Sequence, residues 1–136
     1  MNKGRVILTG IALIVVYVVL ECLVHGDFLK NIYMQTSSVW RPQAEMKQLF
    51  WYMLLGEVIF AYMFAVIFAK GYERGKPGLG QGLRYGLLMA LLLGPPMGLI
   101  WYAVLPIPGM LAVYWALATF VEMLILGLVA GLIYKP

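Results

Sequence analysis

The segment VILTGIALIVVYVVLECLV, residues 6–24, decides the fold class of this chain. It is almost entirely apolar, and its length is close to the ~20 residues that an α-helix needs to cross ~30 Å of hydrocarbon. Lys3 and Arg5 precede it, as basic residues precede the apolar core of a signal peptide. The run is longer than a typical signal core, however, and no small-residue cleavage site follows it. We therefore interpret it as a retained membrane helix.

Three further apolar segments of similar length follow the first. They cover residues 49–69, 83–105 and 108–134. Backbone groups inside hydrocarbon must be paired within their own segment, so each segment is expected to be a helix. The sequence thus predicts an all-α polytopic membrane protein. Residues 1–136 are expected to form a single domain, a compact bundle of four transmembrane helices.

Composition supports a membrane protein and argues against other classes. Of the 136 residues, 63% are hydrophobic, and the mean hydropathy is +0.89, whereas soluble domains are nearer half apolar. Basic residues flank the apolar segments without forming an aromatic-interleaved patch. The net charge of +4 therefore indicates membrane topology and not nucleic-acid binding. A single cysteine, Cys22, excludes an internal disulfide and an all-cysteine metal site.

The connections between the segments predict the topology. Phe28, Leu29, Ile32 and Tyr33 recur at helical spacing, which predicts a short interfacial helix between the first and second spans. Residues 70–82 form a polar, glycine-rich loop, and residues 105–109 a tight uncharged turn. Of the ten basic residues, seven lie at the termini or around the second connection and three in the first. This asymmetry predicts that both termini lie in the cytoplasm.

Small residues recur every four positions in the third span and again in the fourth. Such a stripe lets another helix backbone approach closely. The predicted packing residues are Gly82, Gly86, Ala90, Gly94, Gly98, Gly127 and Gly131. Pro95 and Pro96 remove two N–H donors from the third span and predict a kink there.

Three carboxylates lie inside the predicted spans, at Glu21, Glu57 and Glu122. A charge at the centre of a bilayer costs ~2.5–3.5 kcal/mol on insertion scales, so each carboxylate needs a partner, a proton or a wet cavity. Tyr17, Glu21 and His25 are spaced four residues apart, which places them on one face of the first span.

We expect these groups to form a polar cluster that opens toward the outer surface. Glu57 would reach it from the second span, and Arg41 is the nearest cation by sequence. Glu122 would be buried separately or join the cluster from below. Three interpretations stay open: hydrogen bonds that fix helix packing, a proton or cation path or polar substrate pocket, and metal or haem ligation by His25. One histidine cannot supply the usual multi-ligand metal site unless subunits share it, so no cofactor is predicted.

The overall plan resembles small four-helix bacterial membrane proteins of the domain-of-unknown-function type. The shared features are H-G-x-x-L at the end of the first helix, V-W-R-P in the outer loop, the glycine-striped third helix, and I-L-G-L-V-A-G in the fourth. The resemblance extends over most of the chain as a layout. It implies the same fold and the cytoplasmic membrane, but it carries no activity.

Two classes of function fit these observations. The favoured one is a non-enzymatic accessory or assembly subunit that packs against a larger membrane complex or against itself. The glycine stripe and the absence of P-loop, H-E-x-x-H, C-x-x-C and G-x-S-x-G motifs support it. The alternative is a compact oligomeric transporter or channel for protons, cations or a small polar solute. It would use the intramembrane glutamates and the proline kink.

Overall fold

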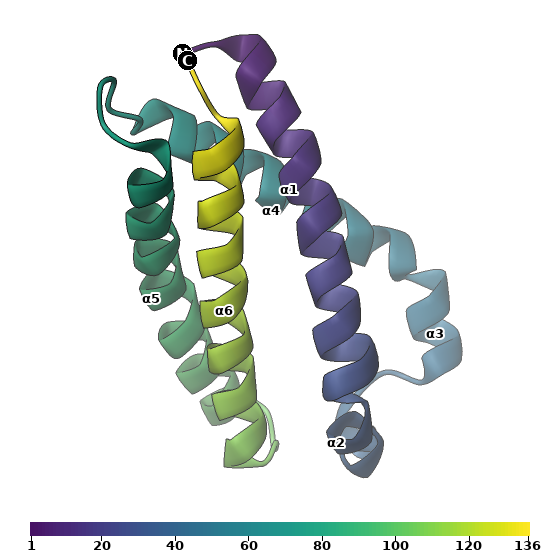
Figure 1. The fold of residues 1–136 in the computed structure, drawn as a ribbon. Helices are drawn as coiled ribbons and strands as arrows, with labels where there is room; N and C mark the ends of the chain where they lie inside the picture. Colours follow the sequence, from purple (N-terminus) through teal and green to yellow (C-terminus); the bar gives the residue numbers. More distant parts are fainter.

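The computed structural model describes residues 1–136 and consists of helices and connecting turns. Four helices are long and apolar enough to cross a membrane: α1 (Lys3–Leu23), α4 (Phe50–Lys70), α5 (Gly78–Val104) and α6 (Gly109–Ile133). The predicted all-α fold, with four such helices in one bundle, is confirmed. Both termini lie at one end of the bundle, and the α5–α6 turn lies at the other (Figure 1).

The first connection is helical along most of its length. A π-helical turn, Val24–Phe28, continues α1, and the short helix α2 (Lys30–Gln35) follows it. A 3₁₀ turn, Ser37–Val39, then leads to α3 (Gln43–Gln48), which precedes α4. Leu29 at the start of α2 packs on Ile107 and Leu111 in a small apolar core. The connection is therefore attached to the α5–α6 turn at the end of the bundle away from the termini.

Helices α5 and α6 form an antiparallel hairpin with the most extensive contact of any helix pair. A Cβ atom added at Gly82 would lie 2.1 Å from the backbone oxygen of Gly127, and one at Gly86 would lie 2.5 Å from that of Met123. Only glycine allows two backbones to come this close. The glycine stripe is thus used inside the chain and is not a free surface for another subunit.

Helix α5 begins earlier than predicted and is continuous. It starts at Gly78, within the segment assigned to a loop, because Gly78 already packs on the backbone of Gly131 in α6. Helical structure also continues through Pro95 and Pro96. Gly78, which looked like a loop residue, therefore extends the glycine stripe that packs on α6.

A second, larger core lies nearer the termini and joins all four long helices. Leu13 of α1, Phe64 of α4, Ala90 of α5 and Leu126 of α6 are fully buried in it. Helix α4 crosses behind α1 (Figure 1). Most other large apolar side chains of these helices point outward, as in proteins whose helices face hydrocarbon.

The loop between α4 and α5 is held by one buried amide. Gln81 is only 6% exposed; its Nε2 donates to the backbone oxygens of Glu73 and Lys76, both at 3.1 Å, and its Oε1 accepts from the Glu73 N–H at 2.7 Å. The Glu73 carboxylate accepts hydrogen bonds from Arg84 and Lys76, and these partners lower the pKa of Glu73 to about 2. Glu73 is therefore ionised at neutral pH.

Replacing Gln81 by leucine is expected to lower the free energy of unfolding by about 1 kcal/mol, because three backbone groups lose their partner and are only partly rehydrated. Thermal unfolding in detergent, followed by circular dichroism, measures the change. Gln48→Leu is the matched control, since Gln48 is exposed at the end of α3. Equal melting temperatures for the two variants would show that the amide does not hold the loop.

Candidate functional site

The end of α1 places an imidazole beside a carboxylate. Glu21 lies in the last turn of α1, and His25 lies four residues later in the π-helical turn. Because helix geometry keeps residues four apart on one face, His25 Nε2 is 3.3 Å from Glu21 Oε2. Single π-helical turns inside helices often occur at functional sites.

A chain of hydrogen bonds links this pair to α6. The Trp115 indole N–H donates to the Tyr33 hydroxyl at 2.7 Å, and that hydroxyl lies 2.5 Å from His25 Nδ1. Burial raises the pKa of Tyr33 to about 12, so its hydroxyl keeps its proton at neutral pH. The tautomer with a proton on His25 Nε2 satisfies every group: Tyr33 donates to Nδ1, and Nε2 donates to Glu21.

Trp40 completes the wall beside this chain. Its indole N–H donates to Thr36 Oγ1 at 2.9 Å. Its ring centroid lies 5.4 Å from that of Tyr33 and 6.0 Å from that of Trp115. The first connection is thus anchored to α6 by aromatic contacts as well as by hydrogen bonds.

These side chains border a cavity of about 350 Å³. One face of α5, one face of α6, His25 and Trp40 line it. The volume is at the lower end of the ~300–1,000 Å³ typical of small-molecule sites. Helices α1 and α6 are close together near the termini and separate toward the other end of the bundle (Figure 1). The lining residues extend from the α5–α6 turn to the middle of α6: His25, Trp40, Gly94, Met97, Gly98, Trp101, Leu105, Trp115, Ala118, Thr119 and Glu122.

Glu122 is the most unusual side chain of the cavity. It is 3% exposed, yet its Oε1 atom is buried without any hydrogen-bond partner. Buried polar groups in proteins are nearly always hydrogen-bonded, and an unpaired one costs ~1–3 kcal/mol. Hydrogen bonds to a neighbouring helix therefore do not account for this carboxylate oxygen.

The other predicted cluster residues are placed differently. Tyr17 lies one helical turn before Glu21 on α1, and Glu57 lies on α4. The Tyr17 ring also packs on Phe60 of α4, with centroids 5.0 Å apart. Glu57 and Tyr17 are not among the residues that line the cavity.

Arg41 lies outside this group of residues. It is 67% exposed and pairs with Glu45, with Nη1 and Oε2 at 3.5 Å. Glu45 lies four residues later, in the first turn of α3, so helix geometry brings the two together. The carboxylates of the long helices thus have no arginine partner in the chain, and proximity in sequence was a poor guide to the pairing of Arg41.

Sequence reasoning did not assign Tyr33, Trp40 and Trp101 to the site. Tyr33 and Trp115 are 82 positions apart, so their hydrogen bond has no local signal. One clue was available in the fourth span. Trp115, Thr119 and Glu122 are spaced by four and three residues, which puts them on a single helix face.

No group of three His, Cys, Asp or Glu side chains is arranged to hold a metal ion. No protein-family model, curated protein or solved structure matches the chain.

Proposed function

We propose that the chain is a multi-pass protein of the cytoplasmic membrane that takes up a small polar solute into the cavity between its spans, as a compact transporter does. The observation that carries the proposal is the buried, unpaired Oε1 atom of Glu122 in the cavity wall. A carboxylate within a membrane span is costly, and such residues commonly mark substrate or ion pathways.

The contrast between Glu122 and Glu21 supports a functional role for Glu122. Glu21 has a partner in His25, which in turn contacts Tyr33. That network already joins the first connection to α6, so a role in helix packing accounts for Glu21. Glu122 has no comparable partner for Oε1. A residue kept only for helix packing would be expected to be hydrogen-bonded to a neighbouring helix.

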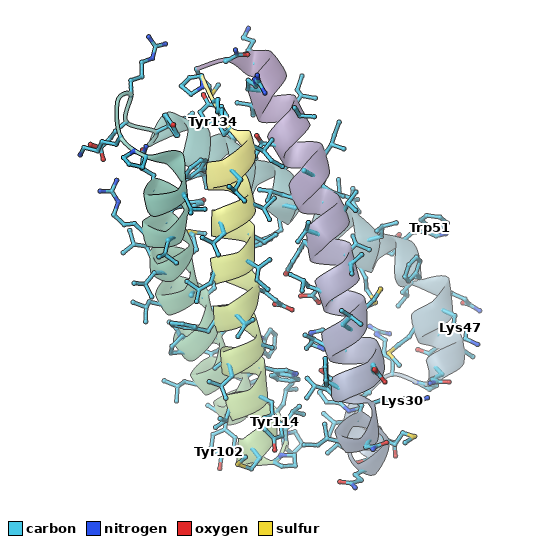
Figure 2. The ribbon with its side chains drawn as sticks, in the orientation of Figure 1. Lys30, Lys47, Trp51, Tyr102, Tyr114 and Tyr134 are labelled. Carbon is cyan, nitrogen blue, oxygen red and sulfur yellow. The ribbon has the colours of Figure 1, made fainter.

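The charge distribution supports entry from the outer side. Lys30 and Lys47 lie in the half of the bundle opposite Tyr134 (Figure 2). The termini and the α4–α5 loop, which carry most of the basic residues, are at the other end. With both termini in the cytoplasm, the cavity half is on the outer side of the membrane.

An accessory subunit that packs on a larger complex stays a prediction. Its main support in the sequence was the stripe of small residues. That stripe is covered by α6 of the same chain, as the contacts of Gly82 and Gly86 with α6 illustrate. The cavity with its unpaired carboxylate is therefore the stronger basis for a function.

Cysteine labelling tests whether the cavity can be reached from water. In a Cys22→Ser background, Ala118→Cys puts a thiol in the cavity wall, and Val121→Cys puts one on the 54% exposed outer face of the same helix. Two membrane-impermeant methanethiosulfonate reagents, one cationic and one anionic, are applied to the outside of sealed vesicles. We expect at least one of them to modify Ala118→Cys, while Val121→Cys, surrounded by lipid, reacts with neither.

Ser37→Cys is the positive control, because Ser37 is exposed in the first connection and should react from the same side. An unreactive Ala118→Cys beside a reactive Ser37→Cys would remove the proposed function. Reaction of Ser37→Cys only from the cytoplasmic side would show that the orientation is reversed.

A further inference from the structure

We infer that the solute bound in this cavity is an organic ammonium cation, held by the carboxylate of Glu122 and by the ring faces of Trp40, Trp101 and Trp115. The inference rests on the proposed function and specifies the chemical class of its substrate. It follows from the charge of the lining, from the use already made of its indole N–H groups, and from the cavity's size.

The lining offers one acidic side chain, Glu122, and no lysine or arginine. Its only other ionisable side chain is His25, whose two ring nitrogens already face Glu21 and Tyr33. An anionic solute would therefore meet a carboxylate without a compensating cation. A cation would pair with the Glu122 carboxylate, for which the lining supplies no lysine or arginine partner.

The aromatic residues favour an organic cation over a neutral polar solute. Three of the four tryptophans of the chain line the cavity. The indole N–H groups of Trp40 and Trp115 are already donated to Thr36 and Tyr33, so these two residues have ring surface and no free donor to offer. Tryptophan has the best side-chain face for a cation, and clusters of aromatic rings are the usual way to bind quaternary ammonium groups.

The cavity is a poor match for a bare metal cation. Hard cations such as Ca²⁺ take ~6–8 oxygen ligands, whereas the side chains of the lining contribute oxygens only from Glu122 and Thr119. At ~30 Å³ per water molecule, about 350 Å³ corresponds to roughly a dozen waters. A cation of the size of choline fits this space, with room for its methyl groups against the indole rings.

Two probes of nearly the same shape separate charge from size. Choline carries a quaternary nitrogen where the neutral alcohol 3,3-dimethyl-1-butanol carries a carbon. The protein is purified with Trp51→Phe, because Trp51 is 71% exposed on α4 and lies outside the cavity. The tryptophan fluorescence of this protein then comes only from the three residues that line the cavity. We expect choline to change the emission and to bind at least tenfold more tightly than the alcohol, with calorimetry as an independent measurement.

Glu122→Gln is expected to weaken choline binding at least tenfold and to leave binding of the alcohol unchanged, because the amide keeps the shape and removes the charge. Glu57→Gln is the matched control. It removes another carboxylate from the long helices, but one that does not line the cavity, and both affinities should stay as they are. The comparison of the two probes on protein that retains Glu122 does not depend on the folding of either variant.

Each failure has a distinct signature. Equal affinities for choline and the alcohol would overturn the cation inference and leave the proposed function intact. Absence of binding by either probe, with Ala118→Cys still reactive, would likewise overturn only the cation inference. Absence of binding together with an unreactive Ala118→Cys would overturn both.

Discussion

Replacing Gly82 by alanine is expected to lower the melting temperature of the folded chain by on the order of 10 °C. The added Cβ would lie 2.1 Å from the Gly127 backbone oxygen and 3.0 Å from the Gly131 Cα. Both contacts are with backbone atoms, which cannot rotate away as a side chain can. The α5–α6 hairpin must therefore separate locally, at a cost of about 3 kcal/mol.

Gly80→Ala is the matched control, because Gly80 lies two residues earlier on the same helix and on its opposite face. A Cβ atom at Gly80 would meet nothing within 4 Å, so the change should stabilise the helix by ~0.5–1 kcal/mol through its backbone entropy. The two variants are compared by thermal unfolding in the same detergent. A Gly82→Ala protein as stable as Gly80→Ala would contradict the close packing of α5 on α6.

Replacing Glu122 by leucine is expected to raise the free energy of unfolding by ~1–3 kcal/mol in the absence of solute. The change removes a buried carboxylate whose Oε1 atom has no partner and replaces it by an apolar side chain of similar size. A residue that is selected for ligand binding often makes the protein less stable than the best structural alternative at the same position would. The measurement is again the melting temperature, taken with and without choline.

Gln81→Leu provides the opposite case. Both residues are buried and polar, but the Gln81 amide is fully used by the α4–α5 loop. The same substitution should therefore destabilise at Gln81 and stabilise at Glu122. If Glu122→Leu also lowered the melting temperature, the carboxylate would have a structural role, and the case for a binding site would lose its main support.

The fold could be predicted from the sequence because the hydropathy of a whole span is set by the residues of that span and not by contacts with other helices. Four apolar runs predicted four long helices, and the structure contains them. The ends were harder to place. Glycine next to a polar loop looks like a helix terminator, yet Gly78 is helical because the backbone of Gly131 lies against it. That contact comes from the other helix of the hairpin and is invisible locally.

The site could be predicted only where its members share a helix. The spacing of Glu21 and His25 predicted their contact, and His25 Nε2 lies 3.3 Å from Glu21 Oε2 in the structure. The bond between Trp115 and Tyr33 depends on how the first connection folds over the bundle. Arg41 was assigned to the cluster because it is close in sequence, but Glu45 is one helical turn away and pairs with it. The cavity results from how the helices pack, and no local residue pattern predicts it.

The hydrogen bond from the Asn2 backbone N–H to the Tyr134 hydroxyl, 3.4 Å long, joins residues 132 positions apart. It has a consequence for biogenesis. Chains are made at ~5–20 residues per second, so α1 precedes its C-terminal partner by on the order of ten seconds. During that time the carboxylate and imidazole at the end of α1 have no Trp115 network to join. The α5–α6 hairpin needs only its own loop to form. The last helix to emerge therefore completes the fold, and a nascent chain shortened at its C-terminus would leave α1 without its closing contact.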